Sequence, residues 1–330
     1  PPGGSAGPPR PFAERRPGPS ALDAPSTWRV FTEAMIAPSL VRVLPLLAIV
    51  AFSSGCDLTK LTANSTAGLF QRAAPAFEQH WDYDLAADAL PGSILQLEGI
   101  MRVVPDEEQT VLGAARAYVA YAFGFVEDQA EALEAEGRTE EAAFQRRRAV
   151  ALYRRARDLA WHRLRLEESD FDEARAESVE DYRAWLEDEF DDAEDAEVLF
   201  WAAYAWGSWV NAASPSAPHP DRAYAIATMR HSVALDPAYY GASGSIFLAF
   251  VATKAPGSTH ERARAAWDVA LDRSGRTNLL AQVTMARLHA VDTHDRALFV
   301  ALLQEVLEAE DVAPSMRLSN QIAKRRAGRY

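Results

Sequence analysis

The side chains best suited to hold another molecule are aromatic residues with polar atoms, set in segments that carry no charge. Between Glu197 and Asp221 there is no acidic or basic residue, and the part at 198–213 holds five aromatic side chains. Residues 238–253 and 117–126 are uncharged in the same way. Pockets for small molecules combine apolar walls with a few oriented polar groups, so these segments predict a binding site. The same composition also suits a densely packed core. The polar groups within them belong to Tyr118, Tyr121, Tyr204, Trp209, Asn211, Tyr239 and Tyr240.

Catalytic and metal-binding sequence patterns are absent. The seven histidines form no HExxH zinc motif, and no Walker loop, GxGxxG or GxSxG sequence occurs. The stretch 241–245, GASGS, lacks the closing glycine of a serine nucleophile elbow. The single cysteine, Cys56, can form neither an intramolecular disulfide nor a cysteine-rich metal or iron–sulfur site. The sequence therefore predicts a protein that is not an enzyme and has no cofactor and no metal.

Charge is concentrated in one stretch of the chain. The 330 residues are 48% hydrophobic and carry a net charge of −13, which argues against a nucleic-acid binder that neutralises phosphates with Lys and Arg. Residues 167–197 hold 16 Asp or Glu against Arg175 and Arg183, a local balance of −14. A cation site is one interpretation, although no DxDxDG loop is present. We expect instead an acidic insertion outside the ligand cleft, either solvated or docking a basic partner through long-range attraction.

The N-terminal region does not have the pattern of a folded domain. Residues 1–34 contain eight of the 19 prolines and no apolar periodicity, which predicts a disordered or upstream extension. Residues 35–56 have the anatomy of a signal peptide: Arg42, an apolar stretch at 43–52, then Ser-Ser-Gly before Cys56. This ending resembles a bacterial lipoprotein signal with a lipidated cysteine, although a serine stands where leucine is usual. A buried cysteine that ends a short core helix is the alternative.

From residue 59 onward, apolar residues recur every three or four positions, which predicts an all-α fold. Gly137 and Gly275 stand where helices end in left-handed geometry, and 258–261 has a capping-box pattern. We expect Pro91 to break its helix. The helices that the sequence predicts are 65–80, 82–102, 106–136, 138–168, 171–188, 193–213, 220–235, 238–254, 258–273, 277–292, 294–309 and 314–327.

Four of these segments share a pattern typical of the second helix in a tetratricopeptide (TPR) unit. A small residue is followed four positions later by a bulky one and three positions after that by another small or apolar one, and in three cases a Pro or Gly follows five positions on. Small residues let the two helices of a unit approach, and three or more units are needed to stack a continuous core. The four sets are Ser93/Leu97/Ile100, Ala149/Tyr153/Ala156, Ala225/Met229/Ser232 and Ala263/Trp267/Ala270.

Several stretches of the chain resemble the TatT family, the T components of tripartite ATP-independent periplasmic (TRAP) transporters. Proteins of this family are TPR-like lipoproteins that accompany a periplasmic substrate-binding P component. The resemblance extends from about residue 56 to residue 327 and implies an α-solenoid of about four degenerate helix-pair units in a domain at 57–330. It also implies a trimer with a central pore and an apolar cleft that receives a ligand. The resembling stretches are 113–128, 199–211, 229–250, 266–291 and 317–327.

The resemblance implies an accessory T component that binds a small, partly apolar ligand in an aromatic-lined cleft and associates with a P component. The protein is then expected in the periplasm, anchored by lipid at Cys56 to the outer rather than the inner membrane. A TPR-like interaction scaffold of the cell envelope is the alternative, in which a concave surface docks a peptide and the aromatic segments are only core. The candidate ligand-binding side chains are Trp201, Tyr204, Trp209, Tyr239 and Tyr240.

Overall fold

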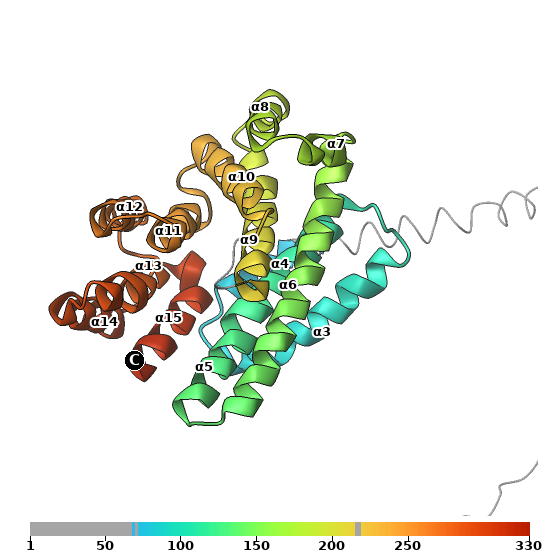
Figure 1. Cartoon of the computed structure of the whole chain (residues 1–330). Helices are drawn as coiled ribbons and strands as arrows, with labels where there is room; N and C mark the ends of the chain where they lie inside the picture. Colours follow the sequence, from blue (N-terminus) through green and yellow to red (C-terminus); the bar gives the residue numbers. More distant parts are fainter. Residues whose placement is uncertain (1–67, 70–71, 215–218) are drawn as a thin grey trace, which may run out of the picture. The chain divides into compact units, whose positions relative to one another are not determined.

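The computed structural model describes residues 68–69, 72–214 and 219–330, and every regular element in this part of the chain is helical (Figure 1). The all-α fold is therefore confirmed. Residues 72–78 are helical and precede the labelled elements. These are α3 (Tyr83–Met101), α4 (Glu108–Tyr121), the π-helical η1 (Ala122–Val126), α5 (Glu127–Ala135), α6 (Thr139–Glu167), α7 (Phe171–Ala176), α8 (Val179–Glu189), α9 (Asp195–Ala213), α10 (Arg222–Leu235), α11 (Tyr239–Lys254), α12 (His260–Arg273), α13 (Leu280–Met285), the π-helical η2 (Ala286–Ala290), α14 (Arg296–Glu308), the short 3-10 helix η3 (Pro314–Met316) and α15 (Arg317–Arg329).

Three expectations about the N-terminal region lie outside the described residues. These are the extension at 1–34, the signal peptide at 35–56 and the lipidated Cys56. They stay predictions.

The expected break at Pro91 is wrong, because α3 continues through this proline. A proline inside a helix removes one backbone hydrogen bond and costs about 3 kcal/mol. Leu90 and Ile94 lie on either side of Pro91 and are 6% and 5% exposed. Burial of such side chains on one helix face contributes more than local helix preference does, so packing holds α3 together.

The single helix expected at 171–188 is also wrong in detail, because the chain forms two helices, α7 and α8, in that region. Helix α7 ends at Ala176, and Ser178 begins α8 as its N-cap, its hydroxyl accepting a hydrogen bond from the backbone N–H of Asp181 at 3.2 Å. This is the N-cap interaction that serine favours. Helix α7 packs on α6 and helix α8 packs on α10, and none of residues 167–197 lines the pocket described below.

The helix ends that depend on backbone geometry mostly follow the sequence. Gly137 and Gly275 have φ values of 75° and 54°, in the left-handed region that their position at helix ends predicts. Helix α12 is capped by Thr259, whose hydroxyl accepts from the N–H of Arg262 at 3.2 Å. The cap is thus the second residue of the 258–261 pattern rather than Ser258.

Consecutive helices pack against each other in pairs, which Figure 1 shows for α5 with α6, α9 with α10 and α11 with α12. The bulky residue of three of the four repeated sets, Tyr153, Met229 and Trp267, is at most 1% exposed. The small residues that flank each of them are buried as well. These pairs support the TPR-like interpretation, and a solenoid of four such units stays a prediction.

The C-terminal helix α15 is tied to distant parts of the chain. The carboxylate of Asp128, 1% exposed, accepts hydrogen bonds from Arg325 at 2.9 Å and from Arg329 at 2.7 Å. Burial raises the pKa of Asp128, but these arginines outweigh it and hold that pKa below its usual value. The amide of Asn320 accepts from the N–H of Leu279 at 3.0 Å and donates to the carbonyl of Thr277 at 2.9 Å. Polar contacts therefore fix α15 beside α5 and the start of α13.

Candidate functional site

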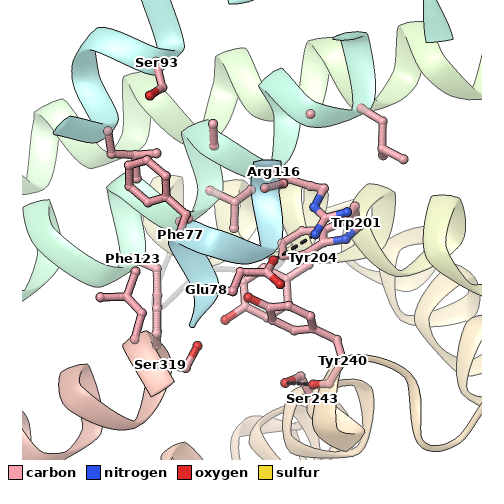
Figure 2. Close-up of a pocket in the computed structure, with 18 of the residues that line it drawn as sticks. Phe77, Glu78, Ser93, Arg116, Phe123, Trp201, Tyr204, Tyr240, Ser243 and Ser319 are labelled. Carbon is pink, nitrogen blue, oxygen red and sulfur yellow. Dashed lines mark hydrogen bonds and ion pairs between the residues drawn. The ribbon is translucent and has the colours of Figure 1, made fainter. Parts of the chain in front are cut away.

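A pocket of about 300 Å³ is lined by buried residues of two hydrophobic clusters of the helical domain, and Leu280, which packs against a third cluster, also lines it (Figure 2). Residues 73–78, α3, α4, η1, α9, α11, α13 and α15 all contribute to its wall. Most of the lining is aliphatic or aromatic, and among the lining residues that the structure describes the only charged ones are Glu78 and Arg116. An apolar pocket of this size with a few polar groups is the usual form of a small-molecule site.

Helix α9 supplies one aromatic wall. Successive residues on this helix are offset by about 100°, so Trp201 and Tyr204, three positions apart, share a face. Both line the pocket together with Phe200, and the Phe200 and Trp201 rings meet edge to face with centroids 5.0 Å apart. Trp201 is 4% exposed. Because α9 has no charged residue after Glu197, it can bury nearly its whole surface and hold these rings in place.

Helix α11 brings Tyr240 to the same pocket through an unusual backbone. Tyr240, Gly241 and Ala242 all have left-handed geometry, with φ of 48°, 61° and 58°. For a residue other than glycine this conformation costs roughly 1–2 kcal/mol. Such strain persists only where surrounding contacts hold it, and it is concentrated at functional sites. We refer to residues 240–242 as the left-handed turn.

Asn278 holds the left-handed turn in place. Its side-chain amide is fully buried and donates hydrogen bonds to the carbonyl of Gly241 at 3.0 Å and to the hydroxyl of Ser243 at 2.9 Å. Ser243 in turn donates to the carbonyl of Tyr240 at 2.7 Å. Figure 2 shows Ser243 beside Tyr240 at one end of the pocket. The ring of Tyr240 meets that of Trp201 with centroids 4.9 Å apart, so the turn and α9 build one aromatic wall.

The five aromatic candidates from the sequence occupy three different positions. Trp201, Tyr204 and Tyr240 line the pocket, and burial raises the pKa of both tyrosine hydroxyls. Tyr239 lies behind this wall, where its hydroxyl accepts from the Trp201 indole N–H at 3.0 Å and donates to Glu197 at 2.9 Å. Trp209 lies outside the pocket, with the guanidinium of Arg157 3.9 Å from its ring centroid.

Sequence reasoning did not single out the charged residues at the pocket. The guanidinium of Arg116 bonds Glu78 at 2.8 Å and Glu197 at 2.5 Å, and it lies 4.9 Å from the centre of the Trp201 ring. Burial lowers the pKa of Arg116, but the two carboxylates outweigh it, so this pKa lies above its ordinary value. One sequence signal was available, since Arg116 is the only charged residue between Glu108 and Glu127. Glu197 does not line the pocket itself but shares the guanidinium of Arg116 with Glu78. We call Arg116, Glu78 and Glu197 the polar end of the site.

The family of the chain follows from comparison with known proteins. The family model for the TRAP transporter T-component matches residues 79–329, which is well over half of the sequence. The chain belongs to the TRAP transporter T-component family. Comparison with curated proteins gave no match. Family membership indicates an accessory role in transport, associated with a TRAP system in the cell envelope.

Within residues 68–69, 72–214 and 219–330, no three His, Cys, Asp or Glu side chains are grouped so that they could hold a metal ion. In the same described ranges, the helices are too short or too polar to cross a bilayer. The chemistry available at the pocket is binding: burial of apolar surface against aromatic rings, and hydrogen bonds or ion pairs at the polar end.

Proposed function

We propose that this protein is the accessory T component of a TRAP transport system and binds a small, partly apolar ligand in the pocket between α4, α9, α11 and α15. The observation that carries the proposal is the apolar pocket of about 300 Å³ in a chain of this family. Its lining offers aromatic faces for the apolar part of a ligand and a polar end for one head group. Ligand bound here would be passed to or received from a periplasmic P component.

Within this proposal, Trp201, Tyr204 and Tyr240 contact the ligand. Tyr239 has a supporting part, because its hydroxyl accepts the indole N–H of Trp201 and so fixes the orientation of that ring. Trp209 takes no part, since it does not line the pocket.

The proposal includes the cellular setting that the sequence predicts. Lipid attached to Cys56 would anchor the helical domain in the periplasm, at the outer rather than the inner membrane. Each buried methylene of an acyl chain contributes roughly 0.8 kcal/mol, so two or three chains hold a protein at a membrane stably. Family resemblance adds assembly as a trimer, which native mass spectrometry of the detergent-extracted protein would measure.

Mass spectrometry of small molecules that co-purify with the membrane-extracted protein tests the ligand directly. We expect a partly apolar compound in the wild type and at least about a tenfold weaker retention in Trp201→Ala, because an aromatic wall is lost. Trp209→Ala is the matched control on the same helix and keeps the ligand. Absence of any small molecule, together with equal behaviour of both variants, would overturn the ligand proposal and favour an interaction scaffold.

Association with a P component needs a separate measurement. Affinity capture with the lipid-anchored protein should recover a periplasmic substrate-binding protein encoded beside it, identified by its sequence. Recovery of other envelope proteins and none of this class would contradict the transport role.

A further inference from the structure

The polar end of the site has more negative than positive charge. Arg116 is its one cation, and Glu78 and Glu197 are two carboxylates, both within 2.8 Å of the guanidinium. The two carboxylates and the hydroxyl of Tyr239 act electrostatically on Arg116 and favour its charged form. The formal charge of this end is therefore −1. This inference rests on the proposed function, because it assumes that a ligand enters the pocket.

An anionic ligand would meet a cation that is already paired. The two terminal nitrogens of Arg116 bond the two carboxylates, one each, and the face of Trp201 lies against the guanidinium. A ligand carboxylate would have to displace Glu78 or Glu197 from it. Removing one partner of a partly buried ion pair is costly, because the displaced charge must find other solvation. A like charge placed among the two carboxylates adds repulsion.

A cationic head group would meet carboxylate oxygens that can still accept hydrogen bonds. Glu78 uses its Oε1 atom for Arg116, and both hydrogen bonds to Glu197 also end on Oε1. In the described part of the chain, the Oε2 atom of each carboxylate takes part in none of these contacts. The side chains are 28% and 36% exposed, so a head group can reach them.

The aromatic rings beside these carboxylates also favour a positively charged head group over a negatively charged one. The face of an aromatic ring carries partial negative charge and attracts cations. The guanidinium of Arg116 already lies over the Trp201 ring, and Tyr204 and Tyr240 add two further rings to the pocket wall. Trp201 and Tyr240 lie in contact at the end of the pocket where Glu78 and Arg116 meet, as Figure 2 shows. Ring faces and spare carboxylate oxygens together form an environment suited to a protonated amine that is attached to an apolar body.

We propose that the ligand of this pocket is an amphiphilic amine, whose ammonium group binds at Glu78 and Glu197 while its apolar part lies among Trp201, Tyr204 and Tyr240. The ammonium N–H groups donate to the Oε2 atoms, and Arg116 stays paired with the two Oε1 atoms. Arg116 is thus a positioning residue that sets the two carboxylates on either side of itself.

Calorimetry with three matched probes tests this proposal: octylamine, octanol and octanoate, with the full chain at neutral pH. They share one apolar tail and differ in head-group charge. We expect octylamine to bind at least about tenfold more tightly than octanoate, with octanol between them. The preference should shrink at high salt, because screening weakens charge interactions at a partly exposed site.

Two variants and one control locate the effect. Glu78→Gln and Glu197→Gln each remove one negative charge while keeping a hydrogen-bond acceptor for Arg116, so each should reduce the preference for octylamine over octanoate. Glu134→Gln is the control, because Glu134 also pairs with an arginine, Arg146 at 2.6 Å, but it neither lines the pocket nor pairs with Arg116. It should leave the preference unchanged.

The outcomes separate this inference from the proposed function. Tighter binding of octanoate by the wild type, or an unchanged preference in both glutamate variants, overturns the amine proposal and leaves a ligand pocket standing. Failure of all three probes to bind, with Trp201→Ala indistinguishable from wild type in retained small molecules, removes the ligand pocket itself.

Discussion

Helices α9 and α11 are alike in amino-acid composition, yet they place aromatic rings at the pocket in different ways. Both are uncharged over most of their length and both contain several aromatic residues. Helix α9 is regular and presents Trp201 and Tyr204 through ordinary helical spacing. Helix α11 begins with the left-handed turn, and Tyr240 reaches the pocket from that strained backbone. Composition therefore marks segments rich in aromatic side chains, whereas helix face and backbone geometry decide which of their rings reach the pocket.

The largest expected effect comes from the regular side of this comparison. Trp201→Ala removes a large side chain that is 4% exposed, and such truncations cost about 3–5 kcal/mol. Chemical denaturation measures the loss. Trp209→Ala, on the same helix but partly exposed, is the control and should cost clearly less. Equal losses would mean that α9 does not distinguish its pocket face from its other faces.

The packing of α11 against α10 gives the next effect. A Cβ atom at Gly244 would lie 2.4 Å from Val233 Cγ2 and 3.2 Å from the sulfur of Met229. Overpacking of this kind costs about 1–3 kcal/mol, so Gly244→Ala should destabilise although alanine is the better helix former. The double variant Gly244→Ala/Val233→Ala should recover part of the loss. Absence of any recovery would show that the cost arises elsewhere.

Loss of the contact that holds the left-handed turn should have a comparable or smaller effect. Asn278→Ala leaves the carbonyl of Gly241 and the hydroxyl of Ser243 without this donor, and an unsatisfied buried group costs about 1–3 kcal/mol. We expect faster hydrogen exchange in residues 240–243 and weaker ligand retention, with α9 protected as before. If hydrogen exchange became faster by the same factor in α9 and α11, a local role for Asn278 would be contradicted.

We expect the smallest changes in stability from substitutions within the left-handed turn itself. Gly241→Ala places a Cβ at a left-handed position and should cost about 1 kcal/mol, whereas Ala242→Gly relieves the same strain one residue later. The Cβ of the first variant meets only ordinary contacts with Met316, at 3.4 Å. Thermal unfolding of the two variants should therefore shift in opposite directions. Shifts in the same direction would indicate that the backbone of the turn is not strained.

Periodicity made most of the fold predictable from the sequence. The positions of α6, α9, α10 and α12 follow from apolar spacing and from local signals such as Gly137 and Gly275, because these act over a few residues. Pro91 and Ser178 were misjudged for opposite reasons. Tertiary burial kept the helix intact at Pro91, whereas a side-chain cap divided it at Ser178.

The site was predictable only in part. Uncharged aromatic segments led to Trp201, Tyr204 and Tyr240, because such rings must lie in a core or a pocket. Trp209 could not be separated from them, since rings on all sides of α9 look alike in sequence. The polar end was missed because Arg116 meets partners that are 38 and 81 positions away along the chain. The left-handed turn was missed because Tyr240 and Ala242 rarely adopt that conformation.

Helix α15 determines when during folding the pocket can first exist. Leu318, Ser319 and Ile322 form part of its wall, yet α15 is synthesised after every other helix that lines it. The Asp128–Arg325 hydrogen bond that fixes this helix closes a loop of 197 positions, and contacts between such distant residues form late in folding. A chain in which α15 has not yet docked therefore has the aromatic residues of the pocket but lacks the part of its wall that α15 supplies. Under the proposed function, ligand capture would be restricted to molecules in which α15 has docked, and bound ligand would in turn stabilise the docked position of α15.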